Sequence, residues 1–103
     1  MRKADCYVYI VSNANRTLYT GMTSNLPARV RQHKERAVEG AFTTRYTFNR
    51  LVWYEFVASR MEALRREKQI KAWTRAKRVA LIQQQNPNWA DLTPSLHELL
   101  MLS

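Results

Sequence analysis

Two short runs of β-forming residues, joined by a turn that contains two asparagines, constrain the fold of this chain more than any other feature. Residues 5–12 (DCYVYIVS) and 17–22 (TLYTGM) are rich in β-branched and aromatic side chains, which favour strands. Asn13 and Asn15 lie between the two runs and favour a turn. We therefore predict a β-hairpin with antiparallel strands near the start of the chain.

Helix-capping signals divide the rest of the chain. Ser24 or Asn25 caps a first helix that has Pro27 in its first turn. Ser59 begins a Ser-x-x-Glu capping box, and Thr74 caps a further helix. The elements predicted after the hairpin are a helix over 26–38, a loop over 41–50, a strand over 51–57, helices over 60–73 and 75–84, and a short tail helix over 93–103 that carries Leu96, Leu99 and Leu100.

This order predicts an α/β (α+β) fold, a small three-stranded antiparallel sheet flanked by helices in the order β-β-α-β-α-α plus a short C-terminal helix. A chain of 103 residues is large enough for one modest core and too small for two, so we expect a single domain over 1–103. The tail helix over 93–103 either covers this core or docks on a partner. A monomer and a weak homodimer both remain open.

The charge of the chain indicates the class of partner. The net charge is +9 and the isoelectric point is near 10.3, which favours a polyanion such as DNA, with RNA as an alternative. The basic residues are not confined to one amphipathic helix, which disfavours a membrane surface. The single cysteine, Cys6, lies in an apolar run and is interpreted as a core residue. With no signal peptide and no membrane span in the sequence, we expect a cytoplasmic protein.

Several polar residues fall where helical periodicity places an inward face. In the first predicted helix, Arg29 and His33 flank the apolar stripe, and in the second Glu67 lies on the inward face. A carboxylate on such a face is costly unless it is paired or binds a metal. Two interpretations of Glu67 remain open, an ion pair with Lys71 or a nearby arginine and a ligand for a divalent cation.

Strand tyrosines on the neighbouring sheet complete this pattern. Each tyrosine alone is an ordinary half-buried strand residue, but Tyr9 and Tyr19 together with the polar helix residues predict one pocket suited to phosphodiester hydrolysis. A carboxylate would hold Mg²⁺ or Mn²⁺, which would polarise the phosphate. An arginine would stabilise the transition-state charge. A tyrosine would act as base or position water, helped by the imidazole.

The ordered motifs resemble those of the GIY-YIG nuclease superfamily, in its small stand-alone form, similar to the nuclease domain of the excision-repair endonuclease. The first motif appears as Tyr7-Val8-Tyr9 and the second as Tyr19-Thr20-Gly21. NLPARVRQH follows at the family spacing, EALRREKQIKAW resembles the segment with the metal-binding glutamate, and NPNWADL looks like the stand-alone subgroup. The family fold, a three-stranded antiparallel sheet flanked by helices, agrees with the predicted order.

The resemblance implies a role for each matching residue. Tyr9 and Tyr19 match the two motif tyrosines, the second similar to the proposed general base. Arg29 matches the catalytic arginine, His33 a Tyr-or-His position, and Glu67 the metal ligand. The implied activity is metal-dependent DNA cleavage in repair or processing, as an endonuclease or exonuclease.

Four departures from the family pattern accompany these matches. Tyr7 stands where the first motif usually has Gly, and Thr20 where the second usually has Ile or Val. Met22 replaces a lysine that some members place near the base, and the asparagine that some members place after the glutamate helix has no clear match. A nucleic-acid-binding protein with weak or no catalysis therefore remains the alternative function.

A dense set of basic residues is the predicted nucleic-acid surface, and a solvated helix face is its alternative interpretation. Most of the set lies on the second and third predicted helices, where it would track a phosphate backbone. No sequence-reading module is recognisable, so we expect binding directed by structure or backbone. The predicted residues are Arg31, Arg45, Arg65, Arg66, Lys68, Lys71, Arg75, Lys77 and Arg78.

Overall fold

A computed structural model describes residues 6–39 and 48–94, with the side chains of residues 6–35 and 48–94. The elements are β1 (Cys6–Ser12), β2 (Leu18–Thr23), α1 (Leu26–Glu39), β3 (Arg50–Val57), α2 (Arg60–Lys71) and α3 (Arg75–Gln85). The predicted α+β fold and its β-β-α-β-α-α order are confirmed. Of the predicted tail helix over 93–103, Thr93 and Pro94 are described and have helical backbone, and residues 95–103 lie outside the described residues.

Element ends differ from the predicted ends by one or two residues. The largest difference is at α2, which ends at Lys71 and not at Trp73. Ala72 is its C-cap, and Thr74 then accepts a hydrogen bond from the Lys77 N–H as the N-cap of α3. The predicted Ser59 cap is also present, since the Ser59 side chain accepts from the Glu62 N–H. The local capping chemistry thus fixes where each helix starts and ends.

The three strands form one antiparallel sheet in the order β2-β1-β3. Tyr9 lies opposite Gly21 on one side and Tyr54 on the other. Between Ile10 and Val11 the pairing with β3 shifts, so Val52 is an extra residue between the partners Leu51 and Trp53. This bulge lets Val52 and Trp53 join the same core while Leu51 faces the other side.

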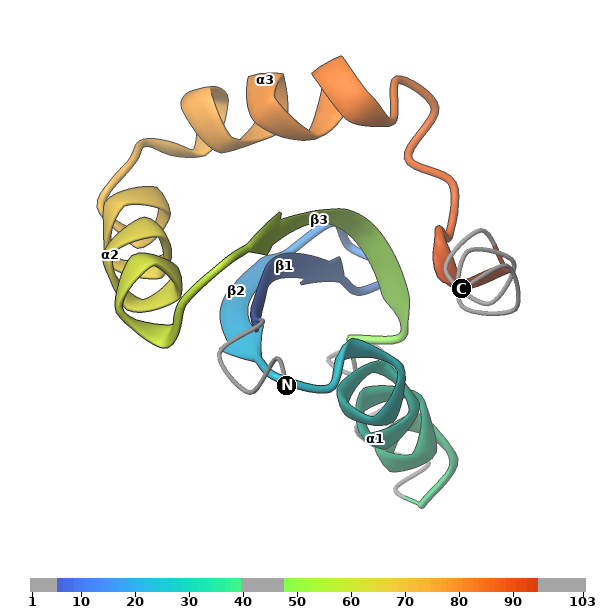
Figure 1. Ribbon diagram of the computed structural model, residues 1–103. Helices are drawn as coiled ribbons and strands as arrows, with labels where there is room; N and C mark the ends of the chain where they lie inside the picture. Colours follow the sequence, from blue (N-terminus) through green and yellow to red (C-terminus); the bar gives the residue numbers. More distant parts are fainter. Residues whose placement is uncertain (1–5, 40–47, 95–103) are drawn as a thin grey trace.

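Helices pack on both faces of the sheet (Figure 1), and each face has its own buried cluster. The α2/α3 face is apolar and includes Val8, Ile10, Ile70 and Ile82, all fully buried. The α1 face is built on a different set, Tyr9, Val11, Leu26, Val30 and Leu51. Cys6 is buried in the α2/α3 cluster, as predicted. Among the described residues, no helix is long and apolar enough to cross a bilayer.

Candidate active site

Alternation along the strands brings the motif tyrosines to the α1 face. Tyr9 is fully buried on the central strand. Tyr19 lies on the neighbouring strand β2, opposite Val11, and keeps 41% of its surface exposed. The two rings lie 6.5 Å apart between centroids. One tyrosine of the pair is therefore a core residue with its hydroxyl at the site, and the other is open to solvent.

Helix α1 supplies the imidazole and the guanidinium that the sequence predicted. The His33 Nε2 atom lies 3.3 Å from the Tyr9 hydroxyl. The His33 ring also packs against both tyrosine rings, with centroid distances of 5.9 Å to Tyr9 and 5.6 Å to Tyr19. Arg29, one turn earlier and half-buried, is hydrogen-bonded to the Tyr9 side chain. The structure thus brings together four residues that are separated by up to 24 positions in the sequence.

Burial raises the pKa of Tyr9 above its ordinary value of 10.0, although the hydrogen bond from Arg29 and its positive charge oppose the rise. Electrostatic interactions with Tyr19 and Glu67 raise it further. The Tyr9 phenol is therefore neutral at physiological pH. As a neutral phenol it can donate to the Nε2 atom of His33 in the tautomer protonated at Nδ1.

Gly21 is required by the closeness of Tyr9. A Cβ atom at position 21 would lie 2.6 Å from the Tyr9 hydroxyl oxygen and 2.7 Å from its ring carbon Cζ. Real side-chain contacts do not come so close, so the Tyr9 ring passes over the backbone of β2 only because residue 21 is glycine. The second motif thus places the solvent-exposed Tyr19 two residues from Gly21, whose missing side chain leaves room for the ring of the buried Tyr9.

Glu67 approaches this group from α2, which packs along β2 and β1 (Figure 1). Its side chain is only 15% exposed, as inward periodicity predicted, and it lies near enough to influence the ionisation of Tyr9. Lys71, one turn later, forms an ion pair with it at 3.0 Å. The ion-pair interpretation of Glu67 is therefore confirmed.

The donor set around Glu67 suits some metals and not others. Within residues 6–39 and 48–94, no group of three or more His, Cys, Asp or Glu residues is placed to hold an ion, as a structural zinc site would need. Mg²⁺ commonly takes one or two protein carboxylates and fills its remaining positions with water and phosphate oxygens. One largely buried carboxylate, close enough to Tyr9 to influence its ionisation, fits that second pattern.

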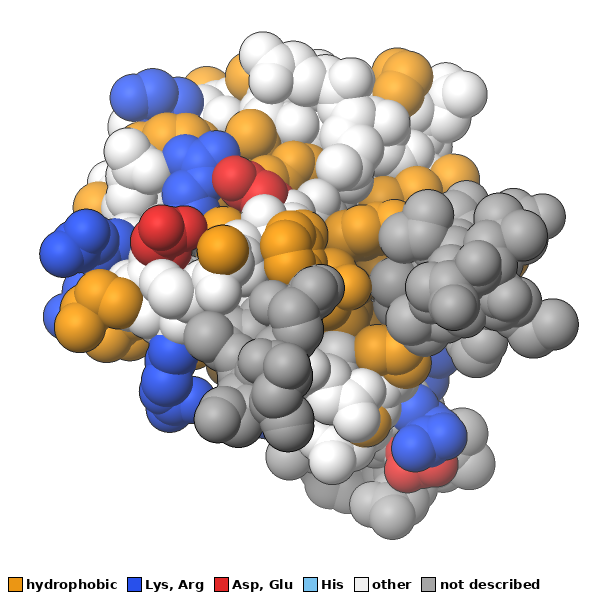
Figure 2. All heavy atoms as spheres, viewed as in Figure 1, with side chains coloured by type: hydrophobic (Ala, Val, Ile, Leu, Met, Phe, Trp, Pro, Cys, Tyr) orange, Lys and Arg blue, Asp and Glu red, His pale blue; other side chains and the backbone are white. Residues whose placement is uncertain are grey.

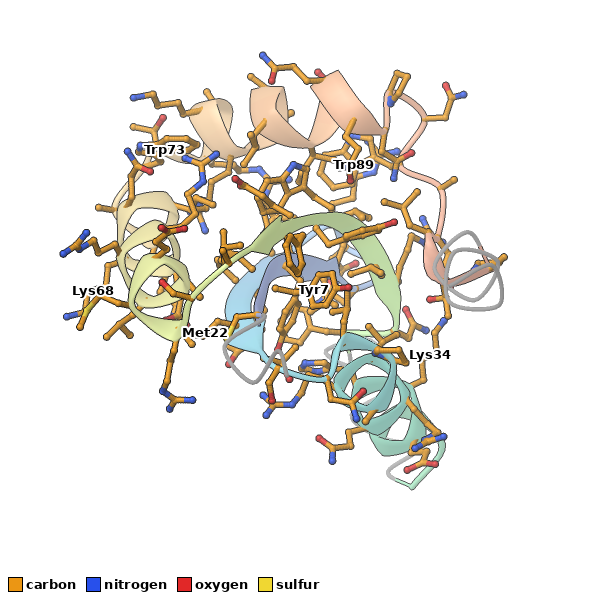
Figure 3. The ribbon with its side chains drawn as sticks, viewed as in Figure 1. Tyr7, Met22, Lys34, Lys68, Trp73 and Trp89 are labelled. Atoms are coloured by element: carbon orange, nitrogen blue, oxygen red, sulfur yellow. The ribbon has the colours of Figure 1, made fainter. Side chains whose placement is uncertain are left out.

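The departures from the motif pattern have defined positions. Met22 and Thr20 lie on the α2/α3 face of β2, opposite to the tyrosines, and Met22 packs against that core. Tyr7 shares the face of Tyr9, where it makes edge contacts with Tyr54 at 6.3 Å and Phe56 at 5.6 Å between ring centroids (Figure 3). The Met22 side chain is therefore part of the hydrophobic core and not of the site.

The predicted basic surface divides into free and engaged side chains. Figure 2 shows lysine and arginine side chains over the α2 side of the molecule. Arg66 bonds to Glu55 and lies over the Trp53 and Trp73 rings, and Lys77 also lies over Trp73. Lys71 is paired, Arg78 is half-buried, and Arg45 lies outside the described residues. The exposed members with neither an ion pair nor an aromatic ring contact in the described part of the chain are Arg31, Arg65, Lys68 and Arg75.

Sequence reasoning left two contacts of this site without an assignment. Phe48 packs its ring against Tyr19, 5.8 Å between centroids, although it was predicted only as part of a polar and aromatic loop. Lys34 and Asp91 form an ion pair that ties α1 to the segment after α3. The NPNWADL segment contains Asp91, but no sequence pattern pairs that carboxylate with a lysine 57 positions earlier.

Comparisons with known proteins agree with this geometry. The sequence model described as the GIY-YIG catalytic domain matches residues 5–80. A UPF0213 protein of Natronomonas pharaonis is 46% identical over 80 residues, covering 77% of this chain and 92% of the relative. A UPF0213 protein of Syntrophus aciditrophicus is 41% identical over 85 residues, covering 79% and 92%.

A solved structure shows the same relationship. The solution NMR structure of a UPF0213 protein from Bacillus halodurans superimposes with a TM-score of 0.54 at 27% identity, covering 86% of this chain and 94% of that one. Sequence motifs, fold and site geometry all lead to one assignment. The chain belongs to the GIY-YIG family, and its relatives are small UPF0213 proteins.

Proposed function

We propose that this protein is a divalent-metal-dependent nuclease that hydrolyses phosphodiester bonds of DNA. The observation that carries the proposal is the convergence of the Tyr9 hydroxyl, His33 Nε2 and Arg29 beside the open Tyr19, with the buried carboxylate of Glu67 in electrostatic range. Membership of the GIY-YIG family supports nuclease chemistry at this site.

Exposure and hydrogen bonding suggest a division of labour among the side chains. Tyr19 is the solvent-facing hydroxyl, so it is placed to orient the attacking water or take its proton. Tyr9, kept neutral by burial, holds His33 in place through the contact between its hydroxyl and Nε2. Arg29 offers its planar guanidinium to the charge that develops on the phosphate. His33 accepts a proton during the reaction.

Glu67 is the residue that would hold Mg²⁺ or Mn²⁺. When bound, such an ion supplies Lewis-acid polarisation of the phosphate and stabilisation of the leaving oxygen. Lys71 is paired with the Glu67 carboxylate in the structure. A metal ion that takes over this carboxylate would displace the Lys71 side chain, which is 50% exposed. Its exposure makes that movement inexpensive.

The free basic side chains support DNA as the polymer. Arg65 and Lys68 on α2 and Arg75 on α3 are exposed and have no ion-pair partner among the described residues. The net charge of +9 adds a long-range attraction to phosphate. These side chains contact backbone charge and not base edges, so we expect binding that depends little on sequence.

A matched pair of glutamates on α2 tests the site. Glu67→Gln and Glu62→Gln remove the same charge from one helix, but only the first lies beside the tyrosines. With Mg²⁺ or Mn²⁺ and several DNA forms, Glu67→Gln should lower the cleavage rate at least about 100-fold, as for loss of a group that stabilises transition-state charge. Tyr19→Phe should also lose cleavage, whereas Glu62→Gln should cleave like the wild type.

The Glu67–Lys71 ion pair also favours a second function, binding of nucleic acid without catalysis, because it already neutralises the carboxylate. That function predicts salt-sensitive DNA binding that survives Glu67→Gln, with no cleavage by the wild type under any metal. Cleavage retained in both Glu67→Gln and Tyr19→Phe would remove these residues from the proposed mechanism.

A further inference from the structure

The last residue of α3 and the segment that follows it lie along the outer edge of β3. We name these residues, 85–93, the C-terminal strap. The Gln85 side chain bonds to both backbone groups of Tyr54, at 3.2 and 3.0 Å. Asn86 donates to the Val52 carbonyl at 3.1 Å, and the Leu92 N–H donates to the Leu51 carbonyl at 2.8 Å. The strap therefore supplies hydrogen-bond partners to the edge backbone groups of Leu51, Val52 and Tyr54.

The strap is fixed at its middle as well as along β3. Asn86 is buried and its side chain also bonds to both backbone groups of Ala90, at 2.7 and 3.0 Å. Trp89 (Figure 3) is 4% exposed and lies under the Arg16 guanidinium, with 4.8 Å between its ring centroid and Cζ of Arg16. Trp89 and Arg16 both have positive φ, 55° and 61°, a conformation that persists only where the surroundings enforce it.

Among the described side chains of helix α1, residues 26–35, apolar burial is found in the first two turns. The buried side chains there are Leu26 and Val30. His33 and Lys34 lie in the next turn. Lys34 extends from α1 toward the strap (Figure 3), where its Nζ donates to the Asn49 carbonyl at 2.9 Å and pairs with Asp91.

Asp91 connects the strap, the sheet and α1 through its two oxygens. Its Oδ1 atom accepts from the Leu51 N–H at 3.3 Å and from the Thr93 N–H and hydroxyl at 3.1 and 2.6 Å. Its Oδ2 atom accepts a hydrogen bond from the Lys34 Nζ atom. Burial alone would raise the pKa of Asp91, but hydrogen bonds from Lys34 and Thr93 hold it below its usual 3.8, so the carboxylate is ionised at neutral pH.

We propose that the Lys34–Asp91 pair is a positioning device, through which the strap sets the turn of α1 that carries His33 against Tyr9. The inference rests on the proposed nuclease function. The matched GIY-YIG region ends at residue 80, so Asp91 acts on the site from outside it. Lys34 and Asp91 are positioning residues, because neither touches the Tyr9–His33 contact itself.

A second ion pair in the protein provides the control. Arg66 and Glu55 are paired at 3.0 Å with side-chain exposures of 26% and 38%, close to the 35% and 33% of Lys34 and Asp91. Glu55→Gln and Asp91→Asn each remove one charge from a half-buried pair. Asp91→Asn also keeps an oxygen that can accept from Leu51 and Thr93. Similar shifts of the melting temperature are therefore expected for both variants.

The two variants should differ at the site. Asp91→Asn should lower kcat about tenfold with little change in KM, because a small displacement of a reacting group is costly, and Glu55→Gln should leave kcat within about twofold of wild type. Lys34→Met should behave like Asp91→Asn, and the double variant should lose no more than either single one. Lys34→Arg should restore the rate.

An NMR measurement separates this inference from the nuclease proposal. The imidazole resonances of His33, assigned with a His33→Gln sample, should shift in Asp91→Asn and Lys34→Met and stay in place in Glu55→Gln. These shifts would support the positioning role even if the wild type cleaves no DNA. Unchanged His33 resonances in both variants, or equal kcat for Asp91→Asn and Glu55→Gln, would overturn it.

Discussion

The two faces of the sheet come from the same three strands but are built for different purposes. On β1, Ile10 faces α2 and α3 in a wholly apolar cluster, while its neighbour Tyr9 faces α1 and carries a hydroxyl in contact with an imidazole. Both residues are fully buried. Burial alone therefore does not distinguish a core residue from a site residue, but the polar partners of the buried group do.

The faces also differ in what holds them together. The α2/α3 face joins side chains from β1, β3 and two helices in one continuous cluster. Among the described residues, the α1 face has a smaller cluster and adds hydrogen bonds and ion pairs, of which Lys34–Asp91 is one. In this part of the chain the first face is packed by apolar side chains, and the second uses part of its buried volume to position polar groups.

The largest expected effect comes from the apolar face. Ile10→Ala should lower the free energy of unfolding by about 3 kcal/mol, since it leaves a cavity in a packed core. Cleavage per folded molecule should be unchanged. Urea unfolding together with single-turnover kinetics measures both quantities. If Ile10→Ala does not fold, Ile10→Val should cost about 1 kcal/mol. A folded Ile10→Val protein that loses cleavage would contradict the assignment of stability to the α2/α3 face and of catalysis to the α1 face.

A smaller effect is expected from the adjacent residue on the other face. Tyr9→Phe should cost about 1 kcal/mol at pH 7, because it removes the hydroxyl contacts with His33 and Arg29. The raised pKa of Tyr9 favours the neutral phenol in the folded state, so this contribution is complete below pH 10.0 and is lost as the pH rises through the folded pKa. The stability gap between wild type and Tyr9→Phe should therefore narrow above pH 10.

Urea unfolding of both proteins at pH 7 and at strongly alkaline pH measures that gap. The other titrating groups are common to the two proteins, so their contributions cancel in the difference. A gap that stays constant or widens at alkaline pH would contradict the assignment of a buried, neutral phenol at Tyr9.

The smallest effect sharpens the role of Glu67. Lys71→Met should change the free energy of unfolding by less than about 0.5 kcal/mol, because Lys71 is half-exposed. Because Lys71 would no longer compete with the ion for the Glu67 carboxylate, Mn²⁺ should bind about twofold more tightly. A twofold change in affinity corresponds to the free energy of an exposed ion pair, less than about 0.5 kcal/mol. Lys68→Met, an exposed lysine on the same helix (Figure 3), is the control. Equal Mn²⁺ affinities in the two variants, measured by calorimetry, would show that Lys71 does not compete.

Much of this organisation was predictable, because local signals are strong. Strand alternation separated Tyr9 from Ile10, and helical periodicity placed Arg29, His33 and Glu67 near the core. The capping residues Ser59 and Thr74 marked the helix starts. Roles for the site residues came from the order of the motifs, and they stay predictions until the variants are measured.

Other features could not be predicted, because they depend on contacts between distant segments. The bulge at Val52 results from the pairing of β1 with β3. The overlap of the Tyr9 ring with Gly21 depends on strand register, and the sequence allowed only a general close approach at that glycine. The sequence shows that Met22 replaces a lysine of some family members, and only the structure shows that its partly buried side chain packs against the α2/α3 cluster.

The sequence by itself determined the elements, their order and the chemical types of the site residues, because propensity, capping and periodicity act over a few positions. Only the tertiary structure decided which tyrosine is buried and which is open, that Lys71 engages Glu67, and that Asp91 reaches Lys34 across 57 positions. Burial, pKa and ion pairing are properties of packed neighbours. They are fixed only when the strands, α1 and the C-terminal strap come together.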